Sequence, residues 1–365
     1  MAWKYRQVQI EDDLAVADSG TKTFDIKVKD PLTALIIRFK AANGAAQVPD
    51  FQPEEAITKV ELTDGGQVYW ALNGPMAVAA SVYGLDRWPR QWYDERANNN
   101  QRINFPIMFG RYIGDEQYAF TPTRLVNPQL KITWADTALF LDDSLTIGLT
   151  AQVMEGLSAP PSMLAWKEVE SWTTASSGEH KVELPTDYTI RALMMRPYVV
   201  SNLWGNIWTN FKLDCDMGKF IPFDLEDHEL GDILRQEFGP YQVGMHHVLT
   251  HNETTQLPMG EVIQVAGGAV GTPYAITLYT AGAWGYMIPY LIDVAGAFGT
   301  DVPIEDLVTG FYPHWSLLWP FGKWMDPATW FSPKREGYGA VDLKLTEGVA
   351  SADGRVAVQQ IRPLP

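Results

Sequence analysis

Two stretches of the sequence resemble each other and decide the fold prediction: GTKTFDIKVKDPLTALIIR at residues 20–38 and GEHKVELPTDYTIRALMMR at residues 178–196. They align without a gap at an offset of 158 residues, from 20 to 178. The identical positions are Gly20, Ala34, Leu35 and Arg38 in the first copy and Gly178, Ala192, Leu193 and Arg196 in the second. Each copy has the pattern of a strand, a short acidic turn and a second strand. Because each copy opens one half of the chain, the sequence indicates an internal duplication.

Hydrophobic and polar residues alternate along most of the chain, as they do in strands with one buried face. Residues 57–72 alternate as far as Leu62, turn at Asp64, Gly65 and Gly66, and then alternate again, which is the signature of a hairpin. The alternation also predicts strands within residues 24–28, 130–134, 145–153, 341–345 and 355–358. Helical spacing is limited to residues 75–83 and 227–238, which end before Gly84 and Gly239.

The sequence therefore predicts an all-β chain of two tandem eight-stranded antiparallel jelly rolls, a double jelly roll, with short helices and long loop insertions. An eight-stranded sandwich needs about 100 residues, so halves that repeat after 158 residues leave room for such loops. The predicted domains are an N-terminal arm (residues 1–19), a first jelly roll (20–155), a linker (156–177) and a second jelly roll (178–365). Long loops are expected at residues 86–101, 204–219, 254–273 and 311–331.

Composition narrows the class of protein. The 365 residues include 28 Lys and Arg against 44 Asp and Glu, a net charge of −16. Such a surface repels polyphosphate, so we expect no direct, sequence-specific nucleic-acid binding. Cys215 is the only cysteine, which excludes an intrachain disulfide and a zinc site built from several thiolates. The polar N-terminus lacks the apolar stretch of a signal peptide, so we expect synthesis and retention in the cytoplasm.

One uncharged stretch raises the question of a membrane span. Residues 262–292 carry no charge, and residues 274–292 would be long enough to cross a bilayer. However, Gly282, Gly285 and Pro289 interrupt the stretch. We therefore predict buried strands and turns there.

Several segments resemble the double-jelly-roll major capsid proteins of tailless icosahedral viruses, most of which carry an internal membrane. The segments are IIRFKAANG (residues 36–44), ITKVELTDGGQVYWALNG (57–74), INFPIMFGRYIGDEQYAF (103–120), NPQLKITW (127–134) and LPTDYTIRALMMR (184–196). They follow one another in the order that such proteins show, and the two-copy layout covers nearly the whole chain.

The resemblance implies a structural protein and not an enzyme, with no cofactor and no catalytic, cofactor-binding or metal-binding residue. It implies a homotrimer whose six similar lobes give a hexagonal outline and tile an icosahedral shell by self-assembly. The implied partners are other copies of the chain, neighbouring trimers, vertex (penton) proteins and minor capsid proteins. The implied location is the virion of a virus such as a bacteriophage, after synthesis in the host cytoplasm.

The acidic net charge limits what the inner side of such a shell can contact. A shell lined directly by genome would need a basic inner face, yet the N-terminal arm offers only Lys4 and Arg6 before three acidic residues. We therefore expect an internal lipid membrane or a separate basic protein between the shell and its genome. The arm would approach the lipid headgroups through Trp3 and Tyr5.

Other motif-like groups give weak indications. His246, His247 and His251 cannot converge on one metal from a straight strand, because neighbouring residues point to opposite faces, so we expect solvated or interfacial histidines. Residues 214–216 (DCD) are expected to hold Cys215 as a buried thiol at a strand end and not as a nucleophile or cation site. Adjacent acidic residues carry no catalytic indication in so acidic a chain; these are Asp142, Asp143, Glu226 and Asp227.

Tryptophans gather in segments that are predicted to be partly loops: Trp204, Trp208, Trp315, Trp319, Trp324 and Trp330. Two interpretations are open. In the first, these rings pack at subunit or inter-domain interfaces. In the second, they form the sugar-stacking platform of a jelly-roll carbohydrate-binding or glycan-cleaving protein, flanked by two acids. The missing export signal and the absence of disulfides favour the first interpretation.

Overall fold

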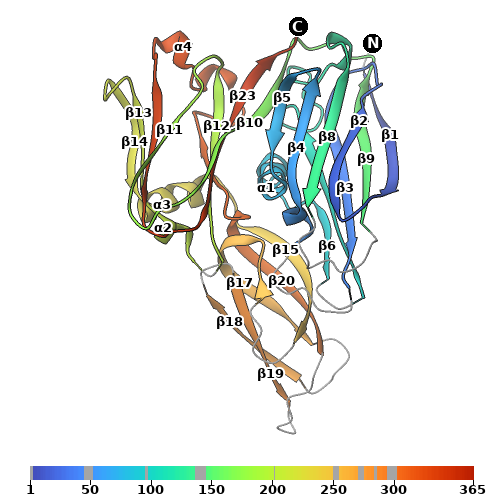
Figure 1. Ribbon diagram of the computed structural model, residues 1–365, viewed down its shortest axis with the longest axis vertical. Helices are drawn as coiled ribbons and strands as arrows, with labels where there is room; N and C mark the ends of the chain where they lie inside the picture. Colours follow the sequence, from blue (N-terminus) through green and yellow to red (C-terminus); the bar gives the residue numbers. More distant parts are fainter. Residues whose placement is uncertain are drawn as a thin grey trace.

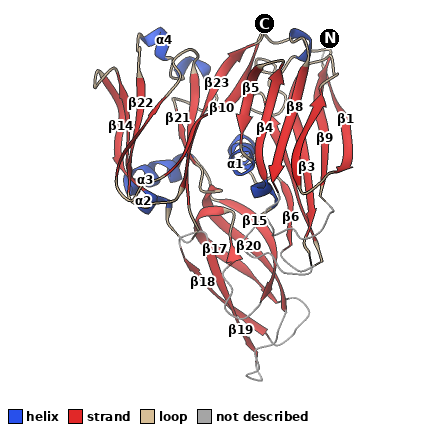
Figure 2. Cartoon of the chain, viewed as in Figure 1, coloured by secondary structure: helices blue, strands red, loops and turns tan. Residues whose placement is uncertain are grey.

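The computed structural model describes residues 3–44, 52–94, 98–135, 145–200, 202–249, 255–269, 275–282, 286–293 and 302–365. Strands dominate these residues, as the sequence predicts. The short helices are α1 (Gly74–Leu85), α2 (Trp204–Ile207), α3 (Asp227–Glu237) and α4 (Pro333–Glu336), with 3-10 turns η1 (Pro53–Ala56), η2 (Pro122–Arg124) and η3 (Pro327–Thr329). Two sandwiches stand side by side, and a narrower group of strands projects from the end opposite to the chain termini (Figures 1 and 2).

The first jelly roll consists of two facing four-stranded layers. One layer has the order β1 (Lys4–Ala15), β9 (Thr146–Glu155), β3 (Leu32–Ala42), β7 (Asn100–Met108). The other has the order β2 (Ser19–Asp25), β8 (Pro128–Ala135), β4 (Ile57–Asp64), β5 (Gln67–Leu72). All these pairings are antiparallel, and the chain passes between the layers in jelly-roll order.

The second jelly roll repeats this order. Its layers are β10 (Ser162–Thr173), β23 (Asp353–Pro363), β12 (Ile190–Tyr198), β21 (Leu317–Pro320) and β11 (Gly178–Glu183), β22 (Val341–Glu347), β13 (Trp208–Cys215), β14 (Phe220–Glu226). A parallel bridge between Ala71 of β5 and Lys167 of β10 joins one layer of each jelly roll into a single sheet. The predicted double jelly roll is therefore confirmed.

The strand positions support the internal duplication. β2 ends at Asp25 and β11 at Glu183, while β3 begins at Leu32 and β12 at Ile190, so both pairs differ by 158 residues. The pairings also correspond, because β3 pairs with β9 as β12 pairs with β23. Equivalent positions in the two jelly rolls can therefore be compared residue by residue.

Two insertions leave the sandwiches at the end away from the termini. β6 (Arg90–Asp94) lies between α1 and β7, and the larger insertion lies between α3 and β21. The larger insertion contains β15 (Tyr241–Leu249), β16 (Thr255–Gln256), β17 (Met259–Ala269), β18 (Ala275–Gly282), β19 (Tyr286–Asp293) and β20 (Val302–Pro313), and we call it the tower. Since β6 pairs with β15, the tower continues a sheet of the first jelly roll. No helix among the described residues is long and apolar enough to cross a membrane.

Several segments predicted to be loops contain strands. Residues 86–101 contain β6, residues 204–219 contain α2 and β13, residues 254–273 contain β17, and residues 311–331 contain β21. In β13 the register shifts between Trp208 and Asn210, which breaks the alternation that marks a strand. These loop predictions were wrong where the strands lie.

The predicted arm and linker also contain strands. β1 lies within residues 1–19 and pairs with β9, and β10 lies within residues 156–177 and pairs with β23. β1 has no buried residue, and the buried residues of β10 stand in a row at 163–166. Neither strand therefore shows the period of two that marks a strand with one buried face, and the sequence prediction missed the opening strand of each sandwich.

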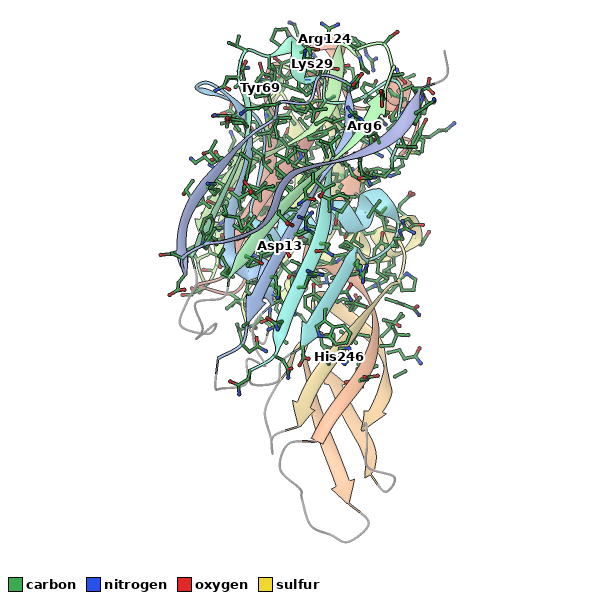
Figure 3. All side chains as sticks on the ribbon, turned by 90° about the vertical axis from the view of Figure 1, so that its right-hand side faces the viewer. Arg6, Asp13, Lys29, Tyr69, Arg124 and His246 are labelled. Atoms are coloured by element: carbon green, nitrogen blue, oxygen red, sulfur yellow. The ribbon has the colours of Figure 1, made fainter. Side chains whose placement is uncertain are left out.

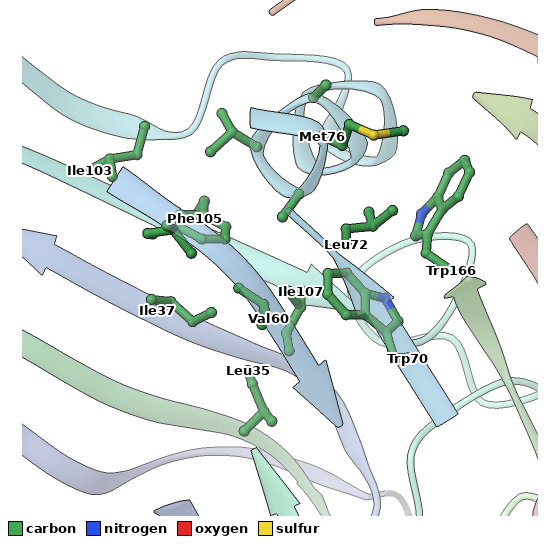
Figure 4. Close-up of a cluster of buried hydrophobic side chains, with 14 of the residues drawn as sticks. Leu35, Ile37, Val60, Trp70, Leu72, Met76, Ile103, Phe105, Ile107 and Trp166 are labelled. Carbon is green, nitrogen blue, oxygen red and sulfur yellow. The ribbon is translucent and has the colours of Figure 1, made fainter. Parts of the chain in front are cut away.

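Packing joins the two sandwiches through α1. This helix carries buried residues on nearly all sides and lies beside the rings of Trp70 from β5 and Trp166 from β10 (Figure 4). It runs through Gly84 to Leu85 and ends with Asp86 in the left-handed conformation at φ 53°, so the predicted stop at Gly84 was early. α3 ends at Glu237, close to its predicted end.

Candidate functional site

None of the candidate metal ligands is assembled into a site within the described part of the chain. There, no three His, Cys, Asp or Glu side chains are grouped as ligands. His246 of β15 stacks on the exposed ring of Trp92 with 4.0 Å between ring centroids and lies 3.5 Å from Glu305. The side chain of His247 and all of His251 lie outside the described residues.

Cys215 is the last residue of β13 and is fully buried. Burial, reinforced by the negative charges of Asp214 and Asp216, raises the pKa of its thiol to about 11. The two aspartates are themselves engaged, since Asp214 lies 2.9 Å from Nζ of Lys344 and Asp216 accepts two backbone N–H groups. The prediction of a buried thiol at a strand end is confirmed, and such a thiol is a poor nucleophile.

The acidic pair at the start of α3 has a structural role. The side chain of Glu226 accepts a bond from the backbone of Glu229, and the backbone N–H of Glu226 donates to Oε2 of Glu229 at 3.0 Å. This reciprocal capping box satisfies the free N–H groups at the helix start. The pair Asp142 and Asp143 lies outside the described residues.

The tryptophans mostly form core. The buried ones, at 0–5% exposure, are Trp204, Trp208, Trp315 and Trp330. Trp208, for example, packs in the second jelly roll between Trp172 and Phe211. Because a ring must be exposed to stack on a sugar, the structure does not support the glycan-binding interpretation. The four buried rings are equally inaccessible to a partner subunit, while Trp319 and Trp324 are half-buried.

The junction between the jelly rolls holds a buried cation that the sequence prediction missed. Arg191 of β12 is 1% exposed, and its guanidinium lies 3.5 Å from the ring centroid of Trp324. It donates to Oε1 of Gln359 at 2.9 Å and to the carbonyl of Trp324 at 3.1 Å. Burial lowers the pKa of Arg191 to about 9, because leaving water disfavours the charged form. The sequence feature that could have indicated this buried cation is the position of Arg191 among the apolar residues of β12.

A second buried polar cluster lies where η1, β6 and the end of the tower meet. Glu54, Tyr93 and His314 are each at most 1% exposed. Oε1 of Glu54 accepts a bond from the Tyr93 hydroxyl at 2.5 Å and lies 2.7 Å from Nε2 of His314. Burial and the nearby Glu54 raise the pKa of Tyr93 well above its ordinary value. No local motif marks this cluster, since its members come from three distant segments.

The N-terminal aromatic residues lie at the start of the chain, and Figure 1 marks both termini at the same end of the molecule. Trp3 and Tyr5 meet edge to face with 4.6 Å between ring centroids. The indole N–H of Trp3 donates to Glu116, and Tyr5 is 52% exposed. The hydroxyphenyl ring of Tyr5 is therefore open to a partner at this end.

The far edge of the second jelly roll is partly apolar. β14 is the last strand of its sheet, and Phe220 and Ile221 on it are 42% and 41% exposed. Met217, in the turn before β14, is 94% exposed. An uncovered edge strand with apolar side chains pairs readily with another chain. This edge of the second jelly roll is therefore a surface on which another chain could pair.

Comparison of the whole chain with known proteins shows similarity of fold only. No family model and no curated protein sequence matches it. The structure is similar to the major capsid protein of Sulfolobus turreted icosahedral virus, with TM-score 0.64 and 10% identity over 99% of this chain and 97% of that one.

Two further solved structures agree with that similarity. The PBCV-1 virus capsid gives TM-score 0.58 and 10% identity over 98% and 93% of the two chains. The major capsid protein P2 of bacteriophage PM2 gives TM-score 0.56 and 9% identity over 98% of each chain. In its two sandwiches and over nearly its full length, this chain has the double-jelly-roll fold of viral major capsid proteins.

Proposed function

We propose that this chain is a major capsid protein, a structural component of an icosahedral virus shell. The observation that carries the proposal is the extent of the match to the Sulfolobus virus protein, which takes in 99% of this chain and 97% of that one. A match of one sandwich would fit many all-β proteins. A match of both sandwiches in tandem over nearly the full length of both chains is more specific, and it supports a role as a shell protein.

The proposed assembly unit is a homotrimer with a hexagonal outline. Three chains of two equivalent jelly rolls present six similar lobes, which suit the packing of an icosahedral facet. The repeat of strand order and register within the chain supports this arrangement. Neighbouring trimers, vertex proteins and minor capsid proteins complete the proposed partners. We place the chain in the virion, after synthesis in the host cytoplasm, and assign it no catalytic role and no cofactor.

We further propose that an internal membrane separates the shell from its genome. The net charge of −16 opposes direct contact with packed nucleic acid. The end that carries the termini, where Tyr5 is 52% exposed, is the proposed inner side, and the tower is the proposed outer side. A virion density map should show a bilayer under the shell. Direct contact between shell and packed genome would contradict this part of the proposal.

The mass of the purified protein tests the proposal in solution. Light scattering after size exclusion should give about three times the chain mass of 40.9 kDa. The same sample in denaturant gives the single-chain mass as a control. A monomer at all concentrations and salt conditions would contradict the trimer.

A further inference from the structure

One outer surface of the second jelly roll is covered from within the chain. Met194 of β12 lies between its strand partners Leu318 of β21 and Ala357 of β23. These three side chains are 0% exposed and belong to the hydrophobic cluster of the first jelly roll, while their neighbours along β12 face the second core. α1 contributes to this cover, since its Ala80 lines a small cavity together with Trp166 of β10 and Arg191 of β12.

The equivalent surface of the first jelly roll is uncovered by the described residues. The offset of 158 places Met194 on Ile36 of β3, whose strand partners are Pro106 of β7 and Thr150 of β9. Ile36, Pro106 and Thr150 are half-buried, whereas the adjacent Leu35 points inward and is 0% exposed. Figure 3 faces this side of the molecule, with Asp13 of β1 on it.

α3 is the counterpart of α1, and one of its sides is uncovered. Each helix follows an edge hairpin, β4 with β5 or β13 with β14. Aligning the helices at their N-cap residues, Asn73 and Glu226, places Ala80 of α1 on Ile233 of α3. Ile233 is 38% exposed. The side of α1 that carries Ala80 meets the second jelly roll. The matching side of α3, which carries Ile233, meets no corresponding jelly roll among the described residues.

Charged residues on both surfaces form ion pairs within the chain. On α3, Asp232 lies 2.7 Å from Arg235. On the outer face of β3 and β7, Arg38 and Arg102 both pair with Asp13 of β1, at 3.1 and 3.5 Å. The two surfaces are therefore matched by their apolar residues and by the internal repeat, and not by opposite net charge.

We propose that α3 of one copy docks on the outer face of β3, β7 and β9 of a second copy. Ile233 would lie against Ile36, Pro106 and Thr150, which repeats between chains the contact that α1 makes within one chain. The contact is head to tail, because it joins two different surfaces, and such contacts form a closed ring when the rotation between copies closes, as the proposed trimer requires. The inference rests on the proposed function, which supplies the trimer, and it adds the surfaces that meet.

Disulfide trapping tests the contact directly. In a variant with Ile233→Cys and Ile36→Cys, mild oxidation should give covalent species of two and three chains on a non-reducing gel. Each single-cysteine variant is the matched control and should remain at one chain, since the native Cys215 is fully buried. Trimers by mass without cross-linking in the double variant would overturn the inference and leave the proposed function intact. Dimers from a single-cysteine variant would also overturn it, because they require a two-fold contact.

A charge placed on α3 gives a second test. Ile233→Asp should weaken trimer formation by at least about tenfold, since a carboxylate would be buried in the contact. Val126→Asp is the control, because Val126 is 95% exposed and lies beside Asp64 at the end of β4, in the other layer of the first jelly roll. Both variants should keep the wild-type circular dichroism and melting temperature as monomers. Equal trimer stability in the two variants would overturn the inference, whereas a monomeric wild type would overturn the proposed function instead.

Discussion

At the scale of single residues, the buried cluster of Glu54, Tyr93 and His314 ties the base of the tower to the first jelly roll. All three side chains are at most 1% exposed, and Oε1 of Glu54 lies close to both of the others. Removing Glu54 would leave the Tyr93 hydroxyl buried without its acceptor, which costs free energy. The cluster therefore links η1 and β6 to the end of the tower and contributes to stability.

Glu54→Ala should lower the free energy of unfolding by about 1–3 kcal/mol, because it leaves the Tyr93 hydroxyl buried without its acceptor. Urea denaturation followed by tryptophan fluorescence measures the change. Glu179→Ala, at an exposed position of β11, should change stability by less than about 0.5 kcal/mol. Equal urea midpoints for the two variants would show that the cluster carries no stabilising interaction.

Asp115 should contribute to the acid sensitivity of the fold. Burial alone would raise the pKa of this carboxyl, but hydrogen bonds from Arg111 at 2.7 and 2.8 Å, with further backbone bonds, hold it below the ordinary 3.8. A carboxyl with a lowered folded pKa stabilises the protein above the unfolded pKa and loses that contribution as the pH falls through the folded value. Asp115→Asn should therefore flatten the dependence of unfolding free energy on pH below about pH 4. An unchanged slope in that range would contradict the assignment.

The thiol of Cys215 should be inert in the folded protein. It is 0% exposed, and its pKa is raised to about 11 by burial and by neighbouring carboxylates. Ellman's reagent at pH 8 should detect no thiol in the native protein and one thiol per chain in guanidinium chloride. Rapid reaction of the native protein would mean that the β13 end opens readily.

At the scale of elements, the two copies of the same strand have different surroundings. β12 is buried on both faces because α1 and the first jelly roll cover its outer side, whereas β3 keeps a half-exposed outer side. In the sequence, this difference shows only as Met194 and Met195 in the second copy of the repeat, where the first copy has Ile36 and Ile37. The duplicated strands are thus alike in backbone and unlike in what their outer faces meet.

Met194→Ala should cost about 2–5 kcal/mol of unfolding free energy, since it opens a cavity in a fully packed site. The equivalent change Ile36→Ala should cost about 1 kcal/mol in the monomer, because Ile36 is only half-buried. Urea denaturation at low protein concentration measures the free energy of unfolding of both variants. Equal costs would show that the outer faces of β3 and β12 are equally buried within one chain.

How far the sequence predicts these elements depends on how clearly each strand shows in its residue pattern. The hairpin of β4 and β5 could be predicted from its alternation, and β2, β3, β11 and β12 from the repeat at an offset of 158 residues. Register shifts do not separate predicted from missed strands, since β3, β12 and the β4–β5 pair carry them as well. β1 has no buried residue, and the buried residues of β10 stand four in a row, so neither strand has a buried face with a period of two. The buried clusters around Arg191 and Glu54 join distant segments, so only the folded chain brings them together.

At the scale of the whole molecule, the chain is two equivalent sandwiches joined through α1, with the termini at one end and the tower at the other (Figure 1). Within one chain, the α1 side of the first jelly roll meets the second jelly roll. The corresponding α3 side of the second jelly roll and the outer face of the first jelly roll are left uncovered by the described residues. In the proposed trimer, repetition of that contact between chains would give a closed ring of six lobes. The similarity to viral major capsid proteins is one of fold, and the role in a shell is the proposal that it supports.

Negative-stain electron microscopy of the purified protein tests this claim most directly. Class averages should show particles with three-fold symmetry, a hexagonal outline of six lobes and towers on one side. Averages of single particles with two lobes, at concentrations that would favour assembly, would contradict the account.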